Sequence, residues 1–250
     1  MEWYMVLALI GTGLAAGFIN TNAGGGSMLT LPLLMFLGLP ANVANGTNRV
    51  AILLQNIIGV HTFRQKKVLD YTTDYRLALP AVAGSIIGAL FAVEIEVQLL
   101  EKIIAGLMVA MLLIVVLKPE VWVKEHAGAV RPKPTFWQYV IFFFIGLYGG
   151  FIQMGVGFFL LSGLVLGCGY NLVKANAIKV FIVLIYTVFT LAIFMLNGQV
   201  NWLAGLILAA GNMAGAWLGV HFSVKGGAKY VRYVLIGALV IVILNLFGVF

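Results

Sequence analysis

The chain has 250 residues, of which 62% are hydrophobic and 9% charged, and its mean hydropathy is +1.08. A soluble domain of this length cannot bury so much apolar surface, so the composition indicates a polytopic helical membrane protein, and the continuous apolar runs exclude a barrel of alternating strands. The formal net charge of +7 comes from basic residues in the connecting loops, which is typical of cytoplasmic loops rather than of nucleic-acid binding.

Ten apolar segments follow one another along the chain, and most have about 20 residues, enough for about 30 Å of helix. Segments 26–38 and 157–170 would reach only about 20 Å, and each directly follows a glycine-rich break. We therefore expect these two segments to be the return arms of hairpins that meet inside the membrane. The ten segments are 3–22, 26–38, 43–63, 77–93, 99–117, 136–153, 157–170, 174–196, 201–221 and 230–249.

The region from Gly17 to Ser27 interrupts an apolar stretch with polar residues and three consecutive glycines, and a weaker version runs from Gly150 to Gly157. Such breaks expose backbone N–H and C=O groups, which are costly in lipid unless protein or a watery cavity satisfies them. One break in each half of a membrane chain points to a transporter's binding site. A helix that restarts at mid-membrane, with Ser27 as its N-cap, would aim free N–H groups and the positive end of its dipole at the break, which favours an anion.

Glycines can also serve only to let membrane helices pack closely. We prefer the functional interpretation for the two breaks, because the polar residues crowded around them have no packing role. We prefer the packing interpretation for the glycines with small-xxx-small spacing, which are Gly84, Gly88, Gly211 and Gly215.

The two halves of the chain share the order and spacing of several motifs, which indicates an internal duplication. Gly17-Phe18-Ile19-Asn20 aligns with Gly150-Phe151-Ile152-Gln153, and the segment 44–48 aligns with 175–179. The stretch between the copies is polar and contains three prolines, as expected of a linker. The predicted domains are a first transmembrane repeat at 1–117, a cytoplasmic linker at 118–135 and a second transmembrane repeat at 136–250.

The distribution of charge favours one relative orientation of the two repeats. If each repeat crosses the membrane an odd number of times, every Lys and Arg except Arg49 and Lys102 falls on one side. If each repeat crosses an even number of times, this bias nearly vanishes. The positive-inside rule therefore predicts inverted repeats, with both termini outside the cytoplasm and the linker inside. Inverted repeats are typical of alternating-access carriers.

Two helices carry matching polar stripes at helical spacing, and such stripes should face the bundle interior or water. Arg49 and Lys179 occupy nearly corresponding places in these stripes, so in inverted copies one cation would guard each entrance for an anion. The alternative for both side chains is snorkelling to the headgroups. Gln55 and Tyr186 also match and are further candidates to line a cavity. The stripes are Asn45, Asn48, Arg49 and Asn56 in the first repeat and Asn176, Lys179, Thr187 and Thr190 in the second.

The predicted substrate-binding set combines the two breaks with the polar stripes that follow them. It comprises Asn20, Thr21, Asn22, Gly24, Gly25, Gly26, Ser27, Asn45, Asn48, Arg49, Gln153, Gly155, Gly157, Asn176 and Lys179.

Acidic residues are absent from the interior of the predicted spans and fall only in loops or at helix ends. Carriers coupled to protons or sodium usually keep a buried carboxylate, so this absence argues against a cationic substrate and weakens the case for proton coupling. The chain lacks zinc-protease, nucleophile-elbow and Walker motifs, so we expect no enzyme activity, no cofactor and no metal site. The expected partners are a small-molecule anion and membrane lipid, not nucleic acid, and a homo-oligomer stays open. The acids at loops or helix ends are Asp70, Asp74, Glu94, Glu96, Glu101, Glu120 and Glu125.

Motifs across both repeats resemble the TauE/SafE family of bacterial membrane permeases, which are associated with export of sulfite and organosulfur anions. In the first repeat they are Gly17-Phe18, Ala23-Gly24-Gly25-Gly26-Ser27, Leu31-Pro32-Leu33-Leu34, Gly38 and Ala44-Asn45-Gly46-Thr47-Asn48. The second repeat departs from this pattern, with Gly155-Val156-Gly157 in place of the glycine run and Val165 in place of Pro32. The resemblance implies transport of a small anion such as sulfite or a sulfonate.

These observations predict an all-α polytopic membrane protein of two inverted repeats, each with a broken, re-entrant helix hairpin followed by three transmembrane helices. The leading hypothesis is a secondary transporter that exports a small anion from the bacterial cytoplasm by alternating access, held between Asn20–Ser27 and Gln153–Gly157. An anion channel that uses the same glycine breaks as a filter is the alternative. A membrane enzyme or an assembly subunit is the third hypothesis.

Overall fold

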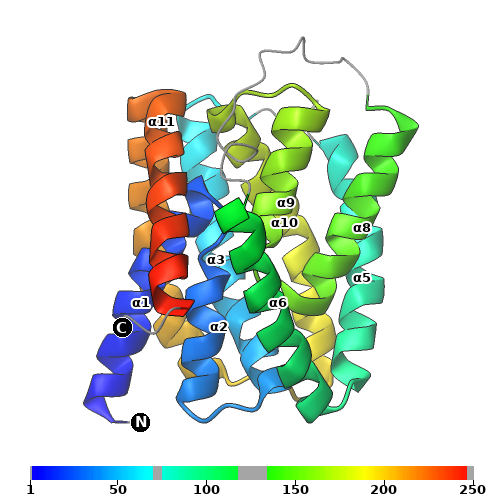
Figure 1. The fold of residues 1–250 in the computed structure, drawn as a ribbon, viewed down its shortest axis with the longest axis vertical. Coiled ribbons are helices and arrows are strands. Elements are labelled where there is room, and N and C mark those ends of the chain that lie inside the picture. Colours follow the sequence, from blue (N-terminus) through cyan, green and yellow to red (C-terminus); the bar gives the residue numbers. More distant parts are fainter. Residues whose placement is uncertain (1, 70–74, 118–133, 247–250) are drawn as a thin grey trace.

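The computed structural model describes residues 2–69, 75–117 and 134–246, with side chains described outside 75, 111–117 and 227–246. Every element within these ranges is helical, and the ranges contain no strand, which confirms the all-helical prediction for them. Most of the helices stand side by side along the long axis of the molecule (Figure 1). The predicted linker lies outside the described residues except for its last two. Three described stretches are long and apolar enough to cross a membrane, namely Trp3–Asn22, Leu172–Leu196 and Trp202–Gly226.

The first half breaks where the sequence predicts. Helix α1 ends at Asn22 and α2 begins at Ser27, so the chain leaves the helical conformation over four residues only. Helix α2 has 10 residues, about 15 Å, which is half of a bilayer core. The elements of this half are α1 (Trp3–Asn22), α2 (Ser27–Phe36), α3 (Ala41–Gln65), the single 3-10 turn η1 (Tyr75–Leu77), α5 (Ala78–Glu94) and α6 (Val97–Leu117).

The second half repeats this order, with one difference from the prediction. Its elements are α8 (Phe136–Ile152), α9 (Val156–Ser162), the π-helical turn η2 (Gly163–Gly167), α10 (Leu172–Leu196) and α11 (Trp202–Leu246).

No loop separates the predicted segments 201–221 and 230–249, because the backbone stays helical between them as part of α11. The ribbon of α11, orange and then red, rises along the molecule and folds back beside itself (Figure 1). Glycine pairs can bend a helix without ending it, and the sequence carries one at Gly226-Gly227.

The two halves interlock, because the first helix of each packs against a late helix of the other. Helix α1 lies along α11, and α8 lies along α5. The backbones approach so closely that a Cβ atom on any of four glycines would come closer than 3.0 Å to the backbone of the facing helix. The packing interpretation is thereby confirmed for these glycines, which are Gly84, Gly88, Gly211 and Gly215.

Helices α3 and α10, which carry the two polar stripes, pack against each other and run antiparallel. Gly46 near the start of α3 lies against Phe194 and Gln199, at the end of α10 and just beyond it. Gly59 near the end of α3 lies against Val180, in the first half of α10. This pair forms a central wall, and the two helix breaks meet beside it.

Candidate functional site

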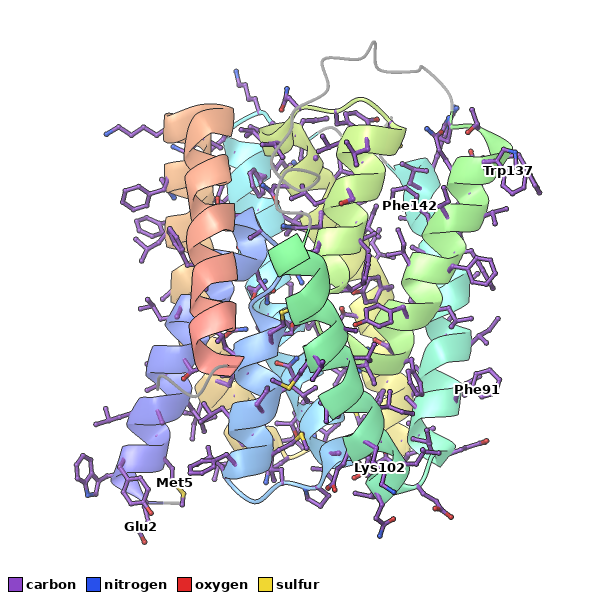
Figure 2. All side chains as sticks on the ribbon, viewed as in Figure 1. Glu2, Met5, Phe91, Lys102, Trp137 and Phe142 are labelled. Atoms are coloured by element: carbon purple, nitrogen blue, oxygen red, sulfur yellow. The ribbon has the colours of Figure 1, made fainter. Side chains whose placement is uncertain are left out.

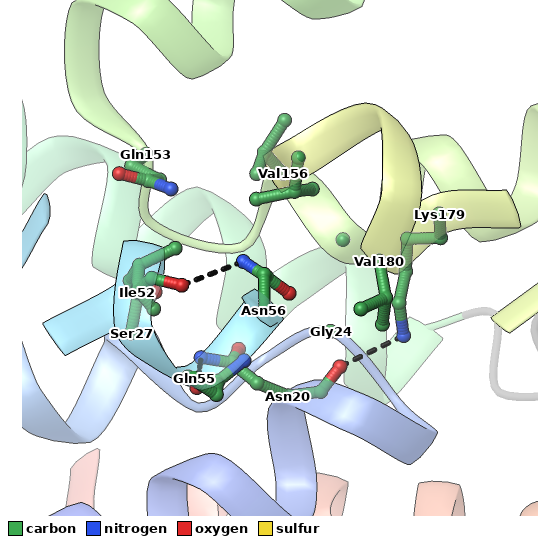
Figure 3. Close-up of a pocket in the computed structure, with 12 residues that line it drawn as sticks. Asn20, Gly24, Ser27, Ile52, Gln55, Asn56, Gln153, Val156, Lys179 and Val180 are labelled. Atoms are coloured by element: carbon green, nitrogen blue, oxygen red, sulfur yellow. Dashed lines mark hydrogen bonds between the residues drawn. The ribbon is translucent and has the colours of Figure 1, made fainter. Parts of the chain in front are cut away.

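A small cavity lies between the two helix breaks (Figure 3). It offers about 20 Å³ of space for the centre of a water molecule, enough for about one water. Its apolar wall consists of Ile52, Val156, Val180 and Val183. Its polar wall consists of Asn20, Ser27, Gln55, Asn56, Gln153 and Lys179, and the backbones of Gly24 and Gly157 complete the lining.

Six of the predicted site residues therefore line this cavity, and they come from both halves of the chain. They are Asn20, Gly24, Ser27, Gln153, Gly157 and Lys179. The other nine predicted residues lie around the cavity without lining it. They are Thr21, Asn22, Gly25, Gly26, Asn45, Asn48, Arg49, Gly155 and Asn176.

Lys179 carries its charge from α10 to the end of α1 in the other half. Its Nζ donates to the backbone oxygens of Asn20 at 2.8 Å and Thr21 at 3.1 Å, and to the Asn176 side chain. The two carbonyls belong to the last turn of α1, where the helix dipole is negative and the intrahelical partners have run out. Because all three ammonium donors have acceptors, the side chain can be buried with its charge.

Arg49 makes the corresponding connection from α3 to the end of α8. Its guanidinium donates to the backbone oxygens of Gly150 at 2.6 Å and Gly149 at 3.3 Å, and to Thr190 Oγ1 at 2.9 Å. The guanidinium carbon also lies 4.4 Å from the centre of the Phe194 ring, a cation–π distance. Arg49 is fully buried but does not line the cavity.

Both cations thus bind the C-terminal end of the broken helix that belongs to the other half. The snorkelling alternative is wrong for Arg49 and Lys179, because their relative exposures are 0% and 2%. Two asparagines reinforce the same ties. Asn45 donates to Phe151 O at 2.8 Å, and Asn176 donates to Asn22 O at 2.9 Å.

The polar stripes face the interior of the bundle, as predicted. All eight of their residues are buried, and several form hydrogen bonds to residues of neighbouring helices. Asn48, for example, accepts a hydrogen bond of 2.7 Å from Thr30 of α2, which ties the return arm of the first hairpin to α3. The stripes therefore hold the two hairpins in place as well as contributing Asn56 and Lys179 to the cavity.

The backbones of the two breaks touch at Gly24 and Gly157. A Cβ atom on either residue would come closer than 3.0 Å to backbone atoms of the other. Gly24 has φ +89° and Gly155 has φ +70°, in the left-handed region that glycine adopts without strain. Gly25 packs against the ring of Phe158. Only glycine permits this approach of two chain segments.

The beginning of α2 differs in detail from the prediction. Gly26, not Ser27, is the N-cap residue, and no side chain caps the helix from that position. Asn20 supplies the missing acceptor, because its Oδ1 takes the Gly26 N–H at 2.8 Å. Ser27 is instead the first helical residue and lies on the cavity, at the positive end of the α2 dipole. Asn22 turns away and donates to the backbone oxygens of Phe18 and Gly219.

Two glutamines belong to the polar wall, and an asparagine of α11 that does not line the cavity contacts one of them. Gln55, a candidate from its match with Tyr186, does line the cavity, whereas Tyr186 is buried without lining it. Gln153 donates to Thr187 Oγ1 at 3.2 Å, and its Oε1 has no partner. Asn212 of α11 was not predicted, although a lone amide in an apolar helix is itself a signal of a functional or structural contact.

The charge balance of the buried region is positive. Among the residues whose side chains are described, Arg49 and Lys179 are buried, while no Asp or Glu is. Glu2 and Lys102 lie at one end of the molecule and Trp137 at the other (Figure 2). The acids Asp70, Asp74, Glu120 and Glu125 lie outside the described residues. Within the ranges searched, no group of three His, Cys, Asp or Glu could hold a metal ion.

Comparison with known proteins identifies relatives over nearly the whole chain. The family model described as sulfite exporter TauE/SafE matches residues 9–246. A probable membrane transporter protein, ORF9 of Sinorhizobium sp., is 28% identical over 94% of this chain and 90% of its own length. A probable membrane transporter protein of Haemophilus influenzae is 27% identical over 91% and 89%, and YfcA of Escherichia coli K12, also a probable membrane transporter protein, is 29% identical over 87% and 80%. No solved structure matches.

Proposed function

The chain belongs to the sulfite exporter TauE/SafE family of membrane transporters, and from this we propose that it is a secondary carrier for a small anion. The substrate is sulfite, a sulfonate or a related organosulfur anion. The carrier exports it across the bacterial cytoplasmic membrane by alternating access.

The observation that carries this proposal is the position of Lys179. The Lys179 side chain lines the cavity where the two helix breaks meet, its ammonium group is bound to the end of α1, and no described acid is buried with it. A buried positive charge in a membrane protein needs a counter-charge or dipoles, and here it has dipoles only. An anion bound in this cavity, after the cavity has widened to admit it, would supply the missing counter-charge.

The remaining wall suits an oxyanion. Ser27 lies at the positive end of α2, and the side chains of Asn20, Gln55, Asn56 and Gln153 bring neutral amides to the same space. Arg49, which is buried at the end of α8 and does not line the cavity, adds longer-range attraction without contact. The expected ligand is therefore small, negatively charged and rich in oxygen acceptors.

We propose that the two halves are inverted repeats and that they exchange access by moving against each other. The antiparallel course of α3 and α10 supports this proposal, and so do the reciprocal ties of Arg49 to α8 and of Lys179 to α1. Carriers built from inverted repeats bind their substrate near the midplane, at the interface between broken helices.

Orientation and energetics favour export. With the basic end of the molecule in the cytoplasm and both termini outside, an inside-negative potential drives an anion outward by about 2.3 kcal/mol per charge per 100 mV. No coupling ion is required for that direction, which agrees with the lack of described buried acids.

The small size of the cavity favours a carrier over an anion channel. The contact between Gly24 and Gly157 leaves room for about one water, not for a continuous file of ions. Flux that saturates with substrate concentration would agree with a carrier, whereas single-channel currents would favour the channel.

The test is a flux assay on purified protein in liposomes, with sulfite, sulfonates and chloride as substrates, with and without a pH gradient. We expect saturable efflux of the sulfur anions that increases with an inside-negative potential. Protein-free liposomes set the background. Absence of any anion flux above this background would contradict the proposed function.

A further inference from the structure

The side-chain amide of Gln55 has an orientation that the backbone of the first break dictates. The Gly26 N–H can only donate, so the Asn20 atom that it contacts at 2.8 Å is the acceptor Oδ1. The other Asn20 atom is then the donor Nδ2, and it lies 3.2 Å from Gln55 Oε1. The remaining atom of the Gln55 amide is therefore the donor Nε2.

Asn212 holds the same orientation from α11. Its Nδ2 donates to Gln55 Oε1 at 3.1 Å, across 157 residues of sequence. Gln55 Oε1 thus accepts two hydrogen bonds, which uses both of its lone pairs. If the Gln55 amide turned over, its NH₂ group would face the Asn20 Nδ2 donor, whose orientation the Gly26 N–H fixes, so the observed orientation is preferred.

The Nε2 group of Gln55 is the one part of this network left open. No described residue accepts a hydrogen bond from it. Gln153 Oε1 and Tyr186 OH also lack partners but are fully buried, whereas Gln55 Nε2 keeps some accessible surface. Gln55 as a whole is only 2% exposed and is one of the residues that line the cavity (Figure 3), and we infer that the free side of its amide faces this space.

We propose that Gln55 donates its Nε2 hydrogens to the bound anion, and that Asn212 is the residue that positions it. This inference rests on the proposed function and assigns roles within the same site. The relay runs from the Gly26 N–H through Asn20 to Gln55, and each member donates to the next, so that only the Gln55 Nε2 hydrogens are left for a ligand. At this position the donor favours an acceptor oxygen of an oxyanion and disfavours a ligand that places an N–H group there.

The variant Gln55→Glu tests this directly, because it replaces the NH₂ group with an oxygen of nearly the same size. The carboxylate still accepts from Asn20 and Asn212, so the fold is retained, but it presents an acceptor and a negative charge to the anion. Loss of a hydrogen bond to a charged ligand corresponds to about 10- to 100-fold weaker substrate binding. Protonation of the introduced carboxylate would restore a donor, so the flux ratio of variant to wild type should rise as the pH falls.

Gln65→Glu is the matched control, since it makes the same change at the exposed end of the same helix, α3. We expect it to transport the anion as the wild type does at every pH. Wild-type flux by Gln55→Glu, or a flux ratio that does not change with pH, would overturn the assignment of Gln55 alone. Absence of anion flux by the wild type would overturn the carrier function and this assignment with it.

The positioning role of Asn212 is tested by a double-mutant cycle. Asn212→Ala should raise KM severalfold in the wild type with little change in kcat, because Gln55 is then less firmly oriented. In a Gln55→Ala background the same substitution should have no further effect on KM. Equal effects in both backgrounds would show that Asn212 acts only on the packing of α11 against α1.

Discussion

Lys179 Nζ and the backbone oxygen of Asn20 lie 2.8 Å apart, although 159 residues separate them in the chain. The Arg49 guanidinium mirrors this contact at the other broken helix, with a distance of 2.6 Å to Gly150 O. The two cations differ in one respect, because only Lys179 lines the cavity. That difference allows their roles to be separated.

Lys179→Met and Arg49→Met should both lower the melting temperature of the purified protein. Each leaves buried carbonyls without donors, at about 1–3 kcal/mol for each group. Anion binding should still raise the melting temperature of Arg49→Met, because an anion at 100 times its Kd stabilises the folded state by up to about 2.7 kcal/mol. It should not raise the melting temperature of Lys179→Met. Thermal unfolding with and without sulfite measures this. An equal response of the two variants to sulfite would contradict the direct role of Lys179, and Arg49→Lys controls for charge.

Gly157→Ala should reduce both transport and stability, because its Cβ would collide with the backbone of Gly24. Overpacking of this kind costs about 1–3 kcal/mol. The comparison is Gly11→Ala on α1, where no atom lies within 4 Å of the added Cβ. Flux and melting temperature of the two variants, measured side by side, check this prediction. Wild-type flux by Gly157→Ala would mean that the two breaks can move apart to admit the added methyl group without any loss of transport.

Ser27→Val should abolish anion flux without preventing membrane insertion. The cavity has room for about one water, and the substitution adds a methyl group and removes a hydroxyl donor at the first residue of α2. Membrane content by immunoblot and flux in liposomes are the two measurements. Normal flux would exclude Ser27 from the substrate site, whereas loss of membrane protein would point to misfolding.

Cysteine labelling tests the inverted repeats. Lys66 and Asn197 are exposed and directly follow α3 and α10, at matching places in the two halves. Inverted copies place them on opposite sides of the membrane. In a Cys168→Ala background, which removes the one native cysteine, an impermeant thiol reagent applied to intact cells should label Asn197→Cys and spare Lys66→Cys. Labelling of both positions, or of neither, would contradict the inverted arrangement.

The breaks were predictable because their signal is local. Polar and glycine residues inside an apolar run cannot be hidden in lipid, so Gly24 and Gly157 stood out in the sequence, and both line the cavity. The burial of Arg49 and Lys179 was also foreseeable from the helical spacing of the stripes. Their partners were not, because no local pattern records which carbonyls will lie across the interface between the halves.

Other features could not be derived from the sequence for the same reason. Asn212 meets Gln55 only because α11 packs on α1 and α3, and a single asparagine in an apolar helix does not indicate its partner. Ser27 was expected to be the cap, but Asn20, in the last turn of α1, takes the Gly26 N–H instead. The gap expected between segments 201–221 and 230–249 is helical in the structure, because a glycine pair can bend a helix without ending it.

The reciprocal ties also constrain how the protein is made. Helix α3 enters the bilayer carrying Arg49 and several amides, and it is not among the stretches apolar enough to cross a membrane on their own. The backbone oxygens that accept hydrogen bonds from Arg49, at Gly149 and Gly150, are synthesised about 100 residues later. We therefore expect α3 to be stable in the bilayer only once α8 has been inserted, so a truncation before residue 149 should leave a fragment that quality-control proteases remove.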